Sequence, residues 1–271
     1  MATKAFNTYT EATSAKASDI LLLHDGNGVK AIRKDILMSE IDIFMQIANR
    51  TYEGRDLTVV FADEIANFSD EWAWIQDRLD NDNVSDLHIF DNIPITVMGE
   101  NHKAQIAGIN TYKGCGDTEI STHIDWITED CLSTTVQWNG SNNNNGNATN
   151  PNPFMASNVK AWLDSSVYPT LDAKVKAVIK DKRILAPTRY TSGSTLTDDN
   201  SWAWTNFTKL WLPLEGEIFD QTVWSTRTYG NGHAVQYPIF ANSYKARIKR
   251  QGPGGSRASW WEASAGSGNA T

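Results

Sequence analysis

The chain has 271 residues, of which 40% are hydrophobic and 21% are charged, a composition that allows a globular fold with a substantial core. The formal net charge of −8 is unevenly spread: residues 1–100 carry 8 Lys and Arg against 18 Asp and Glu, whereas residues 101–271 carry 16 against 14. The acidic first part would repel phosphate groups, which argues against a nucleic-acid partner. No apolar run approaches the roughly 20 residues of a membrane span, so we expect no membrane partner.

The first predicted elements are a β-hairpin and a helix. Residues 19–33 contain an apolar strand, the turn-forming run Asp25-Gly-Asn-Gly28 and a return strand. A helix should follow from about Lys34 to Asn49, with an apolar stripe at helical spacing. A lone hairpin and helix cannot bury this stripe, so residues 1–50 are predicted to anchor a homo-oligomer, with a trimer favoured. The stripe residues expected to mediate oligomerisation are Leu37, Ile41, Phe44 and Ala48.

A small α/β connector is predicted over residues 51–86. Residues 56–61 have the composition of a strand. Ser69 is expected to cap the helix that follows. The buried face of that helix would hold Trp72, Ile75 and Leu79.

Residues 87–271 are predicted to form an irregular, Trp-rich display domain of short strands and a few helices. Nine of the 11 tryptophans lie after residue 100, where they could fill a core or form a binding platform. The whole chain is therefore expected to be α+β, with a hairpin-and-helix anchor before this mixed domain. The expected elements are strands 93–98 and 104–109 across a turn at 99–102, an exposed Asn-rich loop at 139–152, and helices at about 158–165 and 171–179.

The sequence offers little support for catalysis. It has no nucleophile elbow, phosphate-binding glycine loop or His-Glu-x-x-His motif, and we expect neither an enzyme nor a cofactor. Cys115 and Cys131 lack zinc-site spacing and are interpreted as reduced, buried thiols. His123 and Asp125 would share one face of a strand, but without a third ligand an orienting hydrogen bond is favoured and no metal is predicted.

Two runs near the C-terminus are candidates for surface contacts. On a strand, Lys245, Arg247 and Lys249 would point one way, and a solvated face is favoured over contact with the acidic part of a neighbouring subunit. Trp260 and Trp261 would face opposite ways, one into the core and one outward, where it could stack on a sugar ring. A purely core role is favoured for this pair. The candidate ligand-binding residues are Arg257, Trp260, Trp261 and Glu262.

Two stretches resemble known families. Residues 10–36 resemble the short leader at the start of phage tail-fibre and other virion proteins, where a strand, a tight turn and a second strand run into an oligomerising helix. Residues 87–271 resemble a domain of unknown function widespread in Firmicutes and their phages, and more widely the C-type-lectin and sulfatase-modifying-factor folds. The matching pieces are IPITVMGENHKAQIAGINTY (93–112), HIDWITEDCL (123–132), NPFMASNVKAWLDSSVYPTL (152–171), KLWLPLEGEIFD (209–220), QYPIFANS (236–243) and SRASWWEAS (256–264).

Two departures limit what the second resemblance implies. The Trp-Trp pair is usually followed by Leu-Arg-Ser, whereas Glu262-Ala-Ser264 stands here, which weakens any function of the usual Arg. A sulfatase-modifying activity would need paired reactive cysteines near the C-terminal core, and Cys115 and Cys131 lie outside that region.

Together the resemblances imply a bacteriophage virion structural protein that is assembled in the host cytoplasm. A tail-fibre, receptor-binding or host-adhesion role is favoured over capsid decoration or a head fibre. The expected partners are other virion proteins, further copies of the chain and a host cell-surface glycan. A carbohydrate-binding module of the lectin type is the alternative from a different class.

Overall fold

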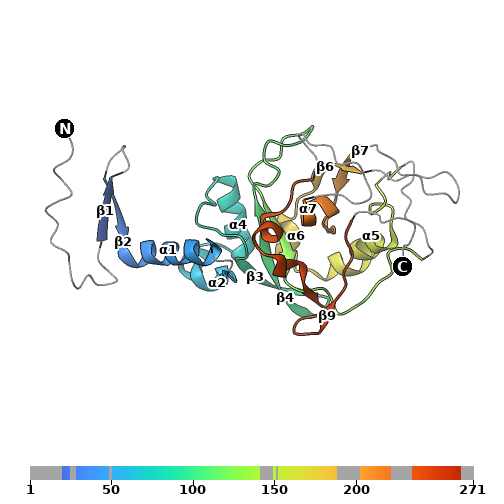
Figure 1. The fold of residues 1–271 in the computed structure, drawn as a ribbon, viewed down its shortest axis with the longest axis horizontal. Coiled ribbons are helices and arrows are strands. Elements are labelled where there is room, and N and C mark those ends of the chain that lie inside the picture. The colour runs from blue at the N-terminus through green and yellow to red at the C-terminus, as the bar shows by residue number, and fades with distance from the viewer. Residues whose placement is uncertain are drawn as a thin grey trace. The chain divides into compact units, whose positions relative to one another are not determined.

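The computed structural model describes residues 20–24, 29–48, 51–140, 149–150, 152–187, 202–220 and 234–263 (Figure 1). The chain divides into two compact units, Met1–Tyr52 and Glu53–Thr271. Helices and small antiparallel sheets occur together, so the predicted α+β class is confirmed. A fold shared with C-type lectins stays a prediction. Within the described residues, no helix is both long and apolar enough to cross a bilayer.

The smaller unit consists of the predicted hairpin and helix. Strand β1 (Ile20–His24) pairs antiparallel with β2 (Val29–Arg33), and α1 (Lys34–Ala48) follows directly. The turn between the strands lies outside the described residues. Along α1, Ile43 is buried, whereas four apolar side chains are exposed by 44 to 62% of their surface. These four are Met38, Ile41, Phe44 and Met45.

The larger unit begins with three short helices where the sequence predicted a strand and one helix. Residues 57–60 form helix α2 (Leu57–Val60), not a strand, because the Asp56 carboxylate accepts the Thr58 backbone N–H at 2.9 Å and Leu57 is completely buried. Helix α3 (Ala62–Ile65) follows. The next helix, α4 (Glu71–Asp80), is capped by Asp70 rather than by the predicted Ser69, since Asp70 accepts both the Trp72 and Ala73 backbone N–H groups.

The largest sheet that the structure describes is three-stranded and antiparallel. Strand β4 (Glu100–Ile109) pairs with β3 (Asn92–Val97) on one side and β5 (Ile124–Thr128) on the other. The β3–β4 turn is tighter than the predicted turn at 99–102. It contains only Met98 and Gly99, both with positive φ, as a two-residue hairpin turn of this twist requires. Residues 100–102 are therefore part of the sheet.

The remaining elements are short. Ser157 caps the helix α5 that follows it, because its hydroxyl accepts the Lys160 backbone N–H at 3.1 Å. Much of the Asn-rich loop lies outside the described residues. Asn152, at its end, is buried against the expectation and donates to the Pro187 carbonyl. The elements in order are α5 (Asn158–Trp162), the π-helix η1 (Leu163–Val167), the 3-10 helix η2 (Tyr168–Thr170), α6 (Ala173–Val178), β6 (Lys182–Pro187), β7 (Trp202–Phe207), α7 (Glu215–Phe219), α8 (Pro238–Asn242), the 3-10 helix η3 (Tyr244–Arg247), β8 (Lys249–Arg250) and β9 (Arg257–Ala258).

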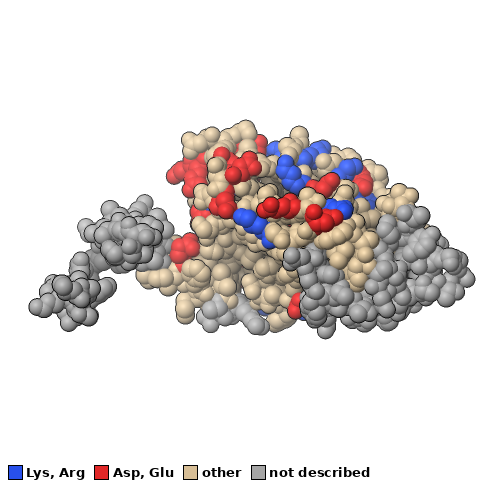
Figure 2. Space-filling model, turned by 90° about the horizontal axis from the view of Figure 1, so that it is seen from above, with Lys and Arg blue, Asp and Glu red and all other residues tan. Residues whose placement is uncertain are grey.

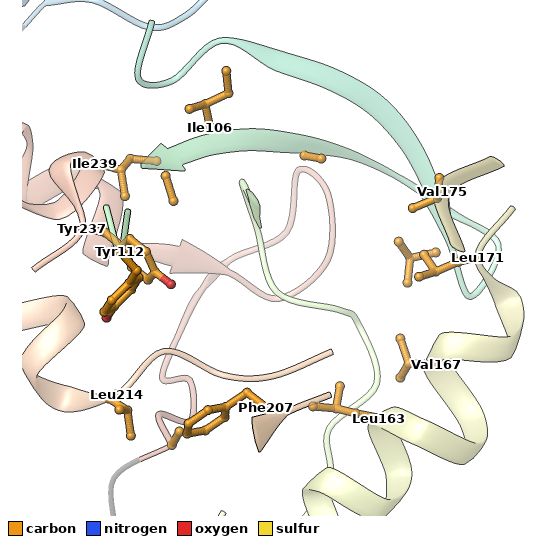
Figure 3. Close-up of a cluster of buried hydrophobic side chains, with 14 of the residues drawn as sticks. Ile106, Tyr112, Leu163, Val167, Leu171, Val175, Phe207, Leu214, Tyr237 and Ile239 are labelled. Atoms are coloured by element: carbon orange, nitrogen blue, oxygen red, sulfur yellow. The ribbon is translucent and has the colours of Figure 1, made fainter. Parts of the chain in front are cut away.

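One hydrophobic core joins these elements (Figure 3). The predicted connector, residues 51–86, contributes four of its members: Leu57, Trp72, Trp74 and Ile75. Helix α8 packs on β4, α7 on α8, and α4 on α6, so segments far apart in sequence contact one another. The C-terminal elements α7, η3 and β9 lie next to one another at the surface.

Candidate ligand-binding site

The described surface is hollowed between three C-terminal segments, and the hollow has a volume of about 410 Å³. Pockets for small molecules typically measure roughly 300–1,000 Å³, so this one is sized for a small ligand. We call it the C-terminal hollow. Its lining comes from the end of α7, the end of η3 and the segment from β9 onward, and comprises Ile218, Phe219, Arg247, Arg257, Ala258, Ser259, Trp260 and Glu262.

Of the adjacent tryptophans, Trp260 lines the hollow and Trp261 does not. The Trp260 indole stacks on Phe240 with ring centres 6.3 Å apart, and its Nε1 donates to the Arg247 carbonyl. Trp261 donates instead to the Val136 carbonyl and lies 6.1 Å from the Trp138 ring. Both side chains are half-buried and pack against the core, so the pair does not divide into one buried and one exposed ring. Hydrogen bonds hold each indole in a fixed orientation.

Two guanidinium groups contribute positive charge to the hollow. Arg247 lies over the Phe219 ring at 5.1 Å, and its Nη2 donates to the Phe240 carbonyl at 3.2 Å. The Nε of Arg247 is buried and has no hydrogen-bond partner. Arg257, on β9, is exposed and pairs in register with Arg250 of β8. One cation of the hollow is therefore fixed by packing and the other is accessible to solvent.

Glu262 adds a titratable carboxyl to the lining of the hollow. Burial and, secondarily, the negative charge of Glu215 raise the pKa of Glu262 to about 7. Near neutral pH the side chain is therefore divided between its neutral and ionised forms. A neutral carboxyl can donate a hydrogen bond, whereas the ionised form only accepts.

The basic residues Lys245, Arg247 and Lys249 do not form the predicted solvated face of a strand. Lys245 and Arg247 lie in η3 rather than on a strand, which separates them from Lys249. Lys249 is buried, and its Nζ donates to the carbonyls of Thr128 and Glu129. Burial lowers the pKa of Lys249 to about 8. On the face shown in Figure 2, basic and acidic side chains are interspersed.

A second polar cluster, which the sequence did not predict, is buried in the core. Lys182 Nζ lies 2.5 Å from Glu217 Oε1 and 2.9 Å from the Tyr237 hydroxyl. Tyr112 donates to the same Glu217 oxygen, and Tyr237 donates to Asp125. The only sequence signal was the pair of acids at 215 and 217 within an otherwise apolar run.

Aromatic rings complete the surroundings of Lys182. Its Nζ lies 5.1 to 5.5 Å from the ring centres of Tyr112, Phe207, Trp211 and Tyr237. Burial raises the pKa of Asp125, and burial together with the nearby carboxylates raises the pKa of both tyrosines. We call this group the Lys182 cluster and interpret it as structural, because its charged atoms are enclosed by the core.

His123 and Asp125 are brought together, but not as the predicted hydrogen-bonded pair. His123 Nε2 is 3.7 Å from Asp125 Oδ2 and instead accepts the Tyr112 backbone N–H at 3.2 Å. The other ring nitrogen lies 2.7 Å from the Ser121 carbonyl. Over the residues the structure describes, no group of three or more His, Cys, Asp and Glu side chains could hold a metal ion. Cys115 and Cys131 are free thiols and only half-buried.

Comparison with known proteins identifies the family but not the activity. The chain belongs to the family described as Domain of unknown function (DUF6273), which matches residues 125–271. No curated protein and no solved structure matches the chain. The matched segment contains every residue that lines the C-terminal hollow.

Proposed function

We propose that this chain is a bacteriophage virion structural protein of the receptor-binding type. In this proposal the hairpin-and-helix unit associates with further copies and other virion proteins. The DUF6273 domain then presents its surface to the host cell. The resemblance of residues 10–36 to virion leaders supports the virion assignment, and the division into two compact units is compatible with an anchor and a display domain.

The observation that carries the proposal is the exposed apolar surface of α1. Ile41 is 44% exposed, Met38 52% and Met45 57%, within a single 15-residue helix. Apolar groups grouped in this way favour burial against a partner surface, and identical helices in a symmetric oligomer can supply it. The predicted stripe residues Leu37 and Ala48 have side chains outside the described part of the structure, so Ile41 and Phe44 represent the stripe here.

The virion assignment is tested by locating the protein. Particles purified from cells that produce it should contain its peptides, detected by mass spectrometry, and antibodies to the full chain should label the particles in electron micrographs. Label at the tail tip would support receptor binding, whereas label over the capsid would support the alternative of decoration or a head fibre. Absence of the protein from purified particles would overturn the virion proposal.

A carbohydrate-binding module of the lectin type is the second candidate, and the C-terminal hollow favours it. Trp260 provides a fixed aromatic ring, and Arg257 and Glu262 provide polar groups beside it. This combination of an apolar surface with a few polar groups is typical of small-ligand sites. A glycan array probed with the full chain tests this candidate: failure to bind any surface glycan would exclude it.

A further inference from the structure

We propose that the C-terminal hollow binds an anionic saccharide, a sugar ring that carries a carboxylate or a phosphate group. The inference rests on the proposed carbohydrate-binding role and specifies its ligand class. It depends on two features of the lining, an aromatic ring for the sugar and guanidinium groups for the anion.

The aromatic part of the site is Trp260. Phe240 packs against its indole in a stacked arrangement, and the Arg247 carbonyl fixes its Nε1. A ring held in this way loses little conformational freedom on binding, which favours affinity. Sugars present apolar C–H faces as well as hydroxyl groups, and an indole offers a large apolar surface to such a face.

The cationic part of the site is made by Arg247 and Arg257. The Phe219 ring and the Phe240 carbonyl hold the Arg247 guanidinium in position, so that it contributes a fixed positive charge. Arg257 is exposed and can adjust to the bound group. Arginine is the side chain best suited to carboxylates and phosphates, because its planar fork donates two parallel hydrogen bonds.

The ionisation of Glu262 should make the affinity of the hollow for an anionic ligand depend on pH. Burial and then repulsion by Glu215 raise the pKa of Glu262, and Arg247 and Arg257 line the same hollow. Once ionised, Glu262 adds a negative charge to the lining, and this charge repels an anionic ligand. Glucuronate, whose carboxylate stays ionised over this range, should therefore bind more tightly at pH 6 than at pH 8, whereas glucose should show little change.

The ligand class is tested by titration calorimetry on the full chain with four probes. These are glucose, glucuronate, glucose 1-phosphate and inorganic phosphate. Both anionic sugars should bind at least about tenfold more tightly than glucose, because one charge-assisted hydrogen bond contributes about this much affinity. They should also exceed inorganic phosphate, which lacks a ring. The ratio of glucuronate to glucose 1-phosphate affinity distinguishes a sugar carboxylate from a sugar phosphate.

Two pairs of variants assign the binding to the hollow. Arg257→Gln should weaken the anionic sugars about tenfold, whereas Arg250→Gln, on the neighbouring strand and outside the lining, should not. Trp260→Leu should weaken all sugars, with Trp204→Leu as the aromatic control away from the hollow. Circular dichroism checks that each variant is folded.

The outcomes separate the two proposals. Equal affinity for glucose and the anionic sugars, lost in Trp260→Leu, would keep the carbohydrate-binding role and overturn the anionic ligand class. Binding that is unaffected by either lining variant would overturn this hollow as the site. No binding by any of the sugars would contradict both proposals.

Discussion

Lys182 Nζ lies 2.5 Å from Glu217 Oε1, and the Glu217 side chain is completely buried while that of Lys182 is only 6% exposed. The pair joins strand β6 to helix α7, and α7 contributes two residues to the C-terminal hollow. Glu217 also accepts the Leu214 backbone N–H at 2.8 Å, which fixes the start of α7. The buried ion pair thus positions one wall of the candidate site.

Replacing Lys182 with Met should destabilise the protein by about 3–5 kcal/mol, because Glu217 would be left as a buried, unpaired charge. The matched control is Lys174→Met, which removes a cation 38% exposed from its ion pair with Glu71 and should cost less than about 1 kcal/mol. Urea unfolding followed by circular dichroism measures both. Equal losses for the two variants would contradict the structural role of the Lys182 cluster.

Glu262 should make folding stability depend on pH. Its pKa of about 7 in the folded protein exceeds the ordinary value of 4.5, so the folded state binds more protons than the unfolded state between these pH values. The free energy of unfolding therefore falls as pH rises from about 4.5 to 7. With solvent screening of this half-buried group, the loss should be about 1–2 kcal/mol.

Glu262→Gln removes this titration. The difference in unfolding free energy between pH 5 and pH 8 should shrink by the same amount in this variant, as measured by urea unfolding. Glu129→Gln is the control, since that carboxylate is 46% exposed in its ion pair with Lys103. If the unfolding free energy of Glu262→Gln depended on pH as it does in the parent chain, the pKa of Glu262 in the folded protein would be close to its ordinary value.

Ile41→Asp on α1 should weaken self-association of the full chain. Each copy would carry a charge into an interface that is expected to be apolar, and burying an unpaired charge is costly. Light scattering over a range of concentrations would detect a lower average mass. Asp42→Asn, one residue along the same helix, changes a charge without altering the apolar surface and should leave the mass unchanged. A monomeric parent chain at high concentration would refute association through α1.

Gly54→Ala should destabilise the larger unit more than Gly99→Ala does. Both glycines have positive φ, so each substitution carries a backbone cost of about 1–2 kcal/mol. At position 54 a Cβ would also lie 1.9 Å from the Phe90 carbonyl oxygen, whereas at 99 it meets nothing within 4 Å. Thermal unfolding of the two variants compares them directly, and equal melting temperatures would mean that the backbone at Phe90 moves aside easily.

Local patterns were sufficient where short-range interactions decide the structure. The hairpin β1–β2 and helix α1 follow from alternation, a strong turn and helical spacing over neighbouring residues. Residues 56–61 show the limit of such patterns. Their β-branched and apolar content indicates a strand, but an Asp56 cap and the burial of Leu57 select a helix.

In the candidate site, too, the sequence predicted some features and the tertiary structure decided others. From the sequence, Arg257, Trp260 and Glu262 could be named as ligand-binding candidates, since they lie within six residues of one another. Other features of the site depend on partners distant in the sequence. Trp261 and the buried Lys249 each donate a hydrogen bond to a carbonyl more than 100 residues away, whereas Trp260 donates to the carbonyl of Arg247 at the end of η3.

The sequence by itself therefore determined the α+β class, the N-terminal hairpin and helix, and the residue types available to bind a ligand, because composition and spacing act locally. Only the tertiary structure decided that Ile218, Phe219 and Arg247 join Trp260 around one hollow and that Lys182 meets Glu217 inside the core. These contacts arise from the packing of distant segments on one hydrophobic core, and no short-range pattern encodes them.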